Sequence, residues 1–283
     1  MTYLMENGEE TIRLEMKTDP EAIRKQAEWC GIKPGMRVLD VGCGPGITTS
    51  ILHEMVQPGG SIVGIDSSED RIEYAKKNYS EKDGIDFYHC DLRTPPDDLG
   101  EFDVLWVRFV LEYFRAEGSA IVGHLKELVK TGGCLCLLDL DYNCLSHYEI
   151  TEEMEDVIRN LMKILDDIYN FDTFAGRKLY SYLYDNAFEN IEVDVMAHSV
   201  IYGDINDVAM FNWVKKAEMI ASLELYDLFN DYSGGYDKFL ADFKEFLVDP
   251  RRFYYSPLIL CKGMKPASRG IEQRSNKKNK HFP

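Results

Sequence analysis

The stretch VLDVGCGPG, residues 38–46, decides the fold of this chain. Its apolar, β-branched start predicts a buried strand that ends at Val41, and glycines follow at positions 42, 44 and 46. Because glycine carries no Cβ, the backbone there can turn sharply and lie against a ligand. A helix is expected to begin at about Ile47. The stretch therefore predicts a binding loop between a central strand and a helix.

The spacing of these glycines narrows the class of ligand. A dinucleotide site has the pattern G-x-G-x-x-G, but Ile47 stands where the third glycine would fall. No Gly-Lys-Ser or Gly-Lys-Thr follows, so the pattern of a P-loop is also missing. The loop suits a nucleoside without phosphates, and a nicotinamide oxidoreductase is disfavoured.

Strands and helices alternate along the chain. Apolar runs bounded by turn residues predict seven strands, at residues 37–41, 61–65, 85–90, 103–107, 134–139, 191–202 and 253–262. The first helix is expected to begin with Asp19 as N-cap and Pro20 in its first turn, and to end at Gly31. This alternation predicts an α/β fold with a doubly wound, mostly parallel sheet and right-handed crossovers.

The glycine stretch resembles the first motif of the class I S-adenosylmethionine-dependent methyltransferases. The resemblance continues in family order through GIDSS at 64–68, CDL at 90–92, FDV at 102–104 and KTGG at 130–133, and it covers roughly residues 20–140 well. The small-molecule, ubiquinone-biosynthesis-type branch of the family is the most similar. The resemblance implies a Rossmann-like methyltransferase fold with a seven-stranded sheet, S-adenosyl-L-methionine as cofactor, and methyl transfer to a small-molecule acceptor.

Two acidic residues follow strands at the carboxyl edge of the predicted sheet, where doubly wound folds bind ligands. Asp66 lies 20 residues after Gly46, and its carboxylate can accept from both hydroxyls of a ribose. It could also cap the next helix, and the two roles are compatible. Asp91 can accept from the adenine 6-amino group while the N–H of Leu92 faces N1 of the ring; the alternative is an aspartate that caps Thr94.

The other expected cofactor residues come from the loop and from the segments around the strand ends. The backbone near Arg108 would hold the methionine amino group, and Cys43 would contact the cofactor rather than act as a nucleophile. By resemblance, Arg13 would meet the cofactor carboxylate; the alternative is a solvated helix charge. The complete expected set is Asp40, Gly42, Cys43, Gly44, Gly46, Asp66, Ser67, Arg71, Asp91, Leu92, Arg108 and Arg13.

The resemblance leaves the catalytic residues open. Related enzymes often carry RFVLEH where this chain has RFVLEY at 108–113, so Tyr113 stands where a histidine is common. The sulfonium already activates the methyl group, so a general base is needed only if the nucleophile, an O, N, C or S atom, must lose a proton. The candidates are Tyr113, Asp141, His147 and His198, and the alternatives are packing, a surface turn or a helix N-cap. No metal is required.

The second half of the chain holds more helix than a crossover needs. We expect residues 1–148 to form the N-terminal part of the core with the cofactor site, 149–176 a helical cap insert, 177–203 a core continuation, 204–250 a second cap insert, 251–266 the final core strand and 267–283 a disordered basic tail. Both inserts leave from carboxyl ends of strands, so they should form a roof over the site. The roof would hold these side chains, unless they belong to the core or a dimer interface: Tyr180, Tyr184, Met210, Phe211, Trp213, Met219, Tyr226 and Phe229.

Composition limits the partners. The 283 residues carry 32 Lys and Arg against 49 Asp and Glu, a formal net charge of −17, and a body so acidic repels nucleic acid. The seven cysteines lack the paired spacing of a zinc site and should be reduced core thiols. No apolar run approaches 18 residues and no signal-peptide pattern occurs, so a cytoplasmic protein without membrane contact is expected, with a homodimer possible.

The residues and the resemblance together predict S-adenosylmethionine-dependent methyl transfer to a small molecule. The alternative is a protein of the same fold that binds the cofactor as a sensor or regulatory subunit without turnover. An intact nucleoside site without a competent acceptor pocket would distinguish that alternative.

Overall fold

The structure is a computed structural model that describes residues 18–94 and 99–267. Its helices are α2 (Pro20–Cys30), α3 (Ile47–Val56), α4 (Glu69–Tyr79), α5 (Gly118–Glu127), α6 (Glu152–Ile168), α7 (Leu179–Asp185), α8 (Asp207–Ser222) and α9 (Gly235–Val248). Its strands are β1 (Arg37–Val41), β2 (Ser61–Asp66), β3 (Ile85–His89), β4 (Phe102–Arg108), β5 (Val129–Leu140), β6 (His147–Tyr148), β7 (Glu189–Tyr202) and β8 (Phe253–Met264). Short 3₁₀ helices are η2 (Leu111–Tyr113), η3 (Gly176–Lys178) and η4 (Tyr226–Phe229). Within the described ranges, no helix is both long enough and apolar enough to cross a membrane.

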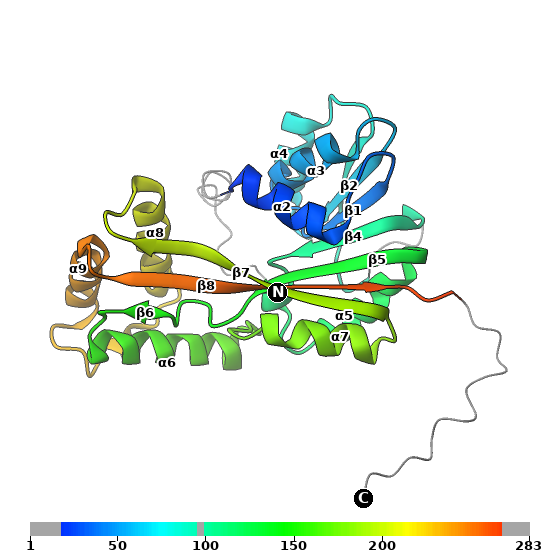
Figure 1. Ribbon diagram of the computed structural model, residues 1–283. Coiled ribbons are helices and arrows are strands. Elements are labelled where there is room, and N and C mark those ends of the chain that lie inside the picture. The colour runs from blue at the N-terminus through cyan, green and yellow to red at the C-terminus, as the bar shows by residue number, and fades with distance from the viewer. Residues whose placement is uncertain (1–17, 95–98, 268–283) are drawn as a thin grey trace, which may run out of the picture.

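The described strands form one sheet in the order β3-β2-β1-β4-β5-β8-β6, and β7 pairs with β8 (Figure 1). Strands β1 to β5 pair in parallel, whereas β8 is antiparallel to β5, β6 and β7. The predicted doubly wound, mostly parallel α/β fold is thereby confirmed. The sheet has eight strands instead of the expected seven, because His147 and Tyr148 pair with Tyr254 and Phe253. A strand of two residues is too short to show an alternating pattern in the sequence.

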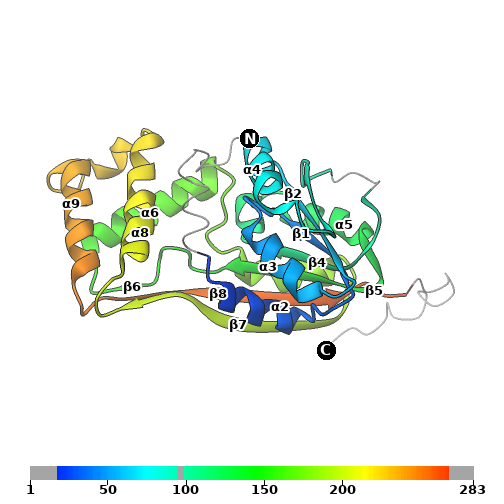
Figure 2. The ribbon, with the colours of Figure 1, turned by 90° about the horizontal axis from the view of Figure 1, so that it is seen from above.

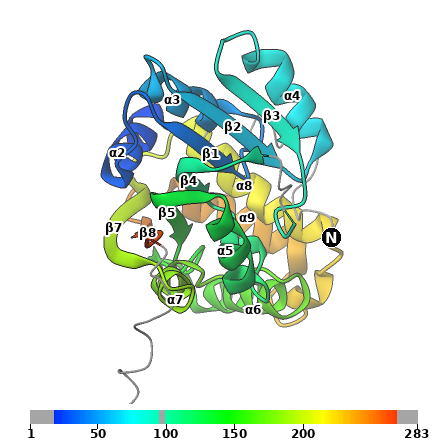
Figure 3. The ribbon, with the colours of Figure 1, turned by 90° about the vertical axis from the view of Figure 1, so that its right-hand side faces the viewer.

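Helices cover both faces of the sheet (Figure 3). Helices α2, α3 and α4 pack on one face with Val38 and Trp106, and α5 and α7 pack on the other with Leu39 and Val107. Successive strand residues point to opposite faces, so both halves of each apolar run are buried. This burial explains why the central strands read as nearly continuous apolar stretches.

Helix α2 begins and ends where the sequence predicts. Asp19 accepts from the backbone N–H groups of Glu21 and Ala22 over 2.9 and 3.3 Å, and Pro20 is the first helical residue. Gly31 ends the helix with a φ of 85°, in the left-handed region that glycine adopts without strain. These caps fix α2 beside α3, the helix that follows the glycine loop.

A separate helical layer lies at one end of the long strands β7 and β8 (Figures 1 and 2). We call α6, α8 and α9 the cap; their side chains, such as Leu161, Trp213 and Phe239, form one apolar cluster. Strands β7 and β8 stay paired as far as Tyr202 and Phe253, beyond the part of β8 that pairs with β5. This extension of the sheet carries the cap.

Two side chains expected in the roof lie elsewhere. Tyr180 and Tyr184 are exposed residues of α7, and their ring centroids lie 6.0 Å apart. The expectation was wrong for them because α7 belongs to the core, where it packs on α5 and β8 through Leu179 and Leu183. Four other expected residues do belong to the cap cluster: Met210, Trp213, Met219 and Phe229.

Candidate active site

The glycine loop between β1 and α3 is tied to the end of β2. Gly42 and Cys43 donate their backbone N–H groups to the carbonyl oxygen of Ile65 over 2.7 and 2.9 Å. Gly42 and Gly44 have φ angles of 72° and 54°. A Cβ at Gly42 would lie 2.5 Å from Cγ2 of Val110, so the loop has no room for a side chain there.

Asp66 ends β2 with a carboxylate that is only 6% exposed. One oxygen accepts from the backbone N–H of Gly44 over 2.9 Å, and the other accepts from the N–H of Ser68, also over 2.9 Å. The first bond holds the glycine loop, and the second shapes the turn into α4. Each carboxylate oxygen has a further lone pair, so Asp66 can hold the loop and accept from a ligand at the same time.

Asp40 lies in β1, two residues before the first glycine of the loop. It is 2% exposed and accepts from Oγ1 of Thr49 on α3 over 2.6 Å. Burial raises the pKa of Asp40 to about 7, against the opposing effects of the Thr49 hydrogen bond and of Arg108. Burial also lowers the pKa of Arg108 to about 10; its Nε donates to Gln26 over 2.9 Å and its guanidinium lies 4.0 Å from the ring centroid of Phe109.

Asp91 follows β3 and carries the next carboxylate along the sheet edge. Nε of Arg93 donates to its two oxygens over 2.9 and 3.1 Å, and these hydrogen bonds lower the pKa of Asp91. Both side chains are more than two-fifths exposed. An exposed ion pair of this kind is worth only about 0–1 kcal/mol, so a ligand amine can replace Arg93 at little cost.

These groups line one cavity of about 460 Å³, which we call the loop cavity. Its volume falls within the range of about 300–1,000 Å³ that is typical of small-molecule sites. Asp40 and Gly46 are not among its lining residues, and Arg13 lies outside the described residues. Nine expected cofactor residues line the cavity: Gly42, Cys43, Gly44, Asp66, Ser67, Arg71, Asp91, Leu92 and Arg108. Burial raises the pKa of the Cys43 thiol well above its usual range, which favours a contact role over nucleophilic chemistry.

Part of the cavity wall was not predicted from the sequence. Tyr169 and Asn170 follow α6, in the first insert, and still line the loop cavity. The side chain of Asn170 holds this segment at the loop cavity. Its Oδ1 accepts from the N–H of Ala116 over 2.9 Å, and its Nδ2 donates to Glu117 over 2.8 Å. An asparagine just after a helix signals a C-terminal cap in a sequence, but no sequence signal indicates that this one reaches a segment more than fifty residues away.

Glu112 and Asp139 form a buried carboxyl pair where β4 and β5 end. They are 5% and 1% exposed, and the backbone N–H of Glu112 donates to Oδ2 of Asp139 over 3.1 Å. Burial, followed by the charge of Glu112, raises the pKa of Asp139 well above its usual range. Glu112 lines the loop cavity, where its Oε2 accepts from Asn143 over 3.1 Å. Glu112 lies in the RFVLEY motif, but nothing in the sequence indicates that it pairs with Asp139.

Of the catalytic candidates, Tyr113 and Asp141 have very different surroundings. Tyr113 lies in η2, lines the loop cavity, and has its ring centroid 5.5 Å from that of Phe171. Asp141 is bound by Arg177, whose Nε and Nη2 donate to its two oxygens over 2.9 and 2.8 Å. Asp141 is not among the lining residues of the loop cavity. The Asp141 ion pair instead holds the segment after β5 against η3.

The two candidate histidines lie apart from each other. His147 is in β6 under the cap, with its ring centroid 4.8 Å from that of Trp213, and burial lowers its pKa to about 3. Neither of its ring nitrogens has a hydrogen-bond partner in the described part of the chain. His198 is on β7, with its ring centroid 5.1 Å from that of Phe109. Among the four candidates, Tyr113 is the one that lines the loop cavity.

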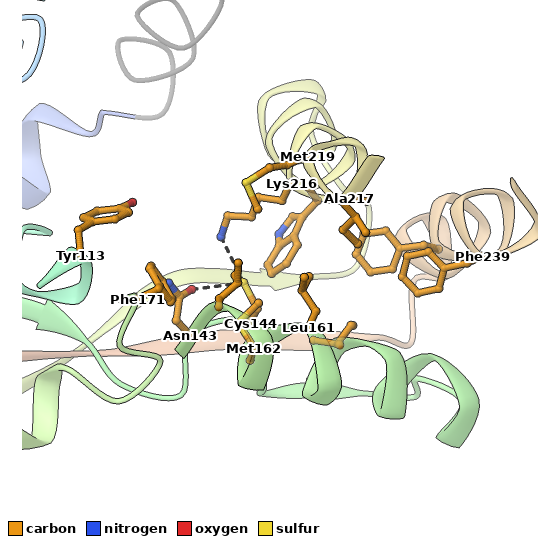
Figure 4. A pocket seen from close by; sticks show the side chains of 15 residues that line it. Tyr113, Asn143, Cys144, Leu161, Met162, Phe171, Lys216, Ala217, Met219 and Phe239 are labelled. Atoms are coloured by element: carbon orange, nitrogen blue, oxygen red, sulfur yellow. Dashed lines mark hydrogen bonds between the residues drawn. The ribbon is translucent and has the colours of Figure 1, made fainter. Parts of the chain in front are cut away.

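A second cavity, of about 100 Å³, lies inside the cap, and we call it the cap cavity (Figure 4). Its polar lining groups are Tyr113, Asn143, Cys144 and Lys216. Tyr113 therefore lines both cavities, which adjoin at this residue. Apolar side chains from three cap helices form most of the wall: Ile158, Leu161, Trp213, Ile220, Phe239 and Phe243.

Comparison with known sequences points to one family. A family model described as a methyltransferase domain matches residues 32–193. Demethylmenaquinone methyltransferase from Lactococcus lactis is 28% identical over 137 residues, which are 48% of this chain and 53% of that protein. An uncharacterized 37.1 kDa protein in transposon TN4556 of Streptomyces fradiae is 29% identical over 114 residues, 40% of this chain and 33% of that protein. The chain thus spans about a third to a half of the length of these relatives.

Comparison with solved structures concerns the fold. The BH2331 protein of Bacillus halodurans C-125 has a TM-score of 0.59 and 20% identity, with 87% of this chain and 100% of that chain covered. A phosphoethanolamine N-methyltransferase of Haemonchus contortus, solved with S-adenosylhomocysteine, has a TM-score of 0.53 and 17% identity, with 87% of this chain and 53% of that chain covered. Both likenesses agree with the predicted Rossmann-like methyltransferase fold.

Proposed function

The chain belongs to the methyltransferase domain family, and on that premise we propose that it transfers a methyl group from S-adenosyl-L-methionine to a small-molecule acceptor. The loop cavity would hold the cofactor, and the cap would hold the acceptor. By their names, the relatives act on acceptors as different as demethylmenaquinone and phosphoethanolamine. Family membership therefore supports a type of reaction and leaves the acceptor open.

The observation that carries this proposal is the bond between the Gly44 N–H and the Asp66 carboxylate, 2.9 Å long, in the wall of the loop cavity. It sets a buried acceptor beside a loop that leaves room for a ligand backbone. The partners of Asp66 that the structure gives are backbone N–H groups of Gly44 and Ser68, and these leave lone pairs for two ribose hydroxyls. The residues present therefore fit a nucleoside cofactor. Asp91 and Leu92 would contact its adenine base, and the glycine loop would contact its methionine part.

The charges around the loop cavity support the same choice. S-adenosylmethionine carries a carboxylate, an ammonium and a sulfonium, so it needs partners of both signs. The lining holds four carboxylates and three arginines. A site for a phosphate-bearing dinucleotide would instead have an excess of basic groups and a G-x-G-x-x-G loop.

The bound cofactor supplies a methyl group on a sulfonium, and the chain's own residues must align the acceptor with it and exclude water. Phe109, Val110 and Phe114 give the loop cavity an apolar side from which water is excluded. Tyr113 would orient the acceptor or take its proton, because it lines both cavities. Asp141 and His147 would act only through the packing of neighbouring segments, since neither lines these cavities.

Isothermal titration calorimetry with S-adenosylmethionine, S-adenosylhomocysteine and NADH tests the cofactor. We expect both sulfur nucleosides to bind with one site per chain and NADH not to bind. Binding of NADH, or no binding of either sulfur nucleoside to folded protein, would contradict the proposal. Release of S-adenosylhomocysteine in the presence of a pool of small molecules then tests turnover, and a sensor protein would bind the cofactor without releasing product from any such pool.

A further inference from the structure

Lys216 sets a positive charge at one side of the cap cavity (Figure 4). Its Nζ lies 3.5 Å from Sγ of Cys144 and 4.6 Å from the ring centroid of Trp213. It makes no ion pair with any carboxylate in residues 18–94 and 99–267, whereas its neighbour Lys215 pairs with Glu218 over 3.3 Å. In a chain with 49 acidic residues, a lysine that faces a thiol and an aromatic ring keeps its charge available for a ligand.

The remainder of the cavity suits an apolar body. Side chains such as Leu161, Ile220 and Phe243 line it, and they present no hydrogen-bonding group. Its volume of about 100 Å³ is several times the ~10–15 Å³ that one water molecule requires, so it can take a group about the size of an aromatic ring. A purely polar ligand would leave its groups without partners against this wall.

The polar groups gather at the end of the cap cavity that is nearer the loop cavity. In Figure 4, Tyr113 lies at one end, Asn143, Cys144 and Lys216 follow, and Phe239 lies at the opposite end. An anionic group beside Lys216 would therefore lie on the side of the reacting methyl group.

We propose that the cap cavity binds the acceptor as an apolar carboxylate: its carboxylate pairs with Lys216, and its apolar body packs between α6, α8 and α9. The inference rests on the proposed function in one respect, because it takes the occupant of this cavity to be the methyl acceptor. Lys216 is then a specificity-determining residue, and the cofactor site does not depend on it.

Three probes of one shape test the charge preference: phenylacetate, 2-phenylethanol and 2-phenylethylamine, titrated calorimetrically into full-length protein saturated with S-adenosylhomocysteine. We expect phenylacetate to bind at least tenfold more tightly than the other two, a difference of about 1.4 kcal/mol. Lys216→Met should abolish this preference, and Lys216→Arg should keep it. The matched control is Lys215→Met, which removes the same charge one residue earlier and should leave phenylacetate affinity unchanged.

Equal affinity for the three probes, or no binding of phenylacetate at millimolar concentration, would overturn the inference in wild-type protein, even if the Lys216 variants fail to fold. An unchanged preference in folded Lys216→Met would also overturn it. A separate titration with S-adenosylhomocysteine tells the two proposals apart. If the nucleoside binds and phenylacetate does not, the inference fails alone; if the nucleoside does not bind, the proposed function fails.

Discussion

The backbone N–H of Gly44 and the carboxylate of Asp66 lie 2.9 Å apart, although the two residues are 22 positions apart in the chain. This bond joins the loop after β1 to the end of β2, the neighbouring strand. The two parts of the candidate cofactor site are thus held together within the protein itself. Because a site that is already ordered spends less binding free energy on ordering, this bond favours affinity.

Asp66→Ala should weaken S-adenosylhomocysteine binding at least tenfold. The variant loses the acceptor for the ribose hydroxyls and the bond that holds Gly44, and one hydrogen bond to a charged group is worth about 1.5–3 kcal/mol. Calorimetry gives the dissociation constant, with a cooperative thermal transition as the check on folding. Asp66→Asn keeps the size of the side chain and one acceptor oxygen. Its affinity for S-adenosylhomocysteine should therefore lie between those of the wild type and Asp66→Ala. An unchanged constant in folded Asp66→Ala would remove this residue from the site.

Gly42→Ala should destabilise the protein and weaken cofactor binding, because the new methyl would lie 2.5 Å from Cγ2 of Val110. The left-handed backbone adds about 1–2 kcal/mol, and crowding typically adds about 1–3 kcal/mol. Gly132→Ala is the control for backbone strain, since Gly132 has a φ of 77° and no atom lies within 4 Å of the place that its new methyl would take. Urea unfolding measures both free energies of unfolding.

The double variant Gly42→Ala, Val110→Ala makes room for the new methyl. It should be less destabilised than the sum of the two single changes, because neighbouring substitutions that relieve a clash are not additive. Strict additivity would mean that the close approach at Gly42 does not limit the loop.

His147 should make stability depend on pH. Burial lowers its pKa to about 3, below its usual value of 6.5, so the unfolded chain binds a proton more readily than the folded chain. The free energy of unfolding that neutral His147 contributes is fully present above pH 6.5 and is lost as the pH falls toward 3. Between pH 7 and 5 the loss should be about 2 kcal/mol of unfolding free energy, from 1.4 kcal/mol per unit.

His147→Phe should remove that loss and keep the aromatic packing with Trp213. The control is His124→Gln, at an exposed histidine of α5, which should leave the pH dependence unchanged. Urea unfolding at pH 5, 6 and 7 distinguishes the variants. If His147→Phe loses as much stability on acidification as the wild type does, another group causes the effect.

Ala217→Leu should fill part of the cap cavity, whose wall includes this residue. We expect S-adenosylhomocysteine affinity to stay within about threefold and acceptor methylation to fall at least tenfold, because the acceptor loses its space. Ala209→Leu makes the same change on the same helix but outside the cavity lining and should leave both quantities unchanged. Normal methylation by folded Ala217→Leu would place the acceptor elsewhere.

The fold and nine of the residues that line the loop cavity were predictable from the sequence because their determinants are local. The glycines, Asp66 and Asp91 each follow a strand, and parallel strands bring their ends to one edge of the sheet. The cap was predictable as helices from their apolar periodicity, but its cavity was not. The contact between Asn170 and Glu117, and the presence of Tyr113 and Lys216 in the wall of one cavity, depend on how segments far apart in the sequence pack together.

Two of the catalytic candidates show which properties a local sequence pattern leaves out. Asp141 and His147 were selected for their chemistry, yet one is bound by Arg177 and the other is surrounded by aromatic rings. The residue types fit catalysis, but burial and partners decide which groups can reach a ligand. The pairing of β6 with β8 was also hidden, because two residues carry no periodicity.

Tyr113 forms part of the wall of both cavities, so neither ligand can displace its ring without altering the space open to the other. If the cofactor binds in the loop cavity and the acceptor in the cap cavity, the two binding equilibria are linked through this side chain. By thermodynamic reciprocity, the factor by which bound cofactor changes acceptor affinity equals the factor by which bound acceptor changes cofactor affinity. Replacing the Tyr113 ring would then change both factors by the same amount.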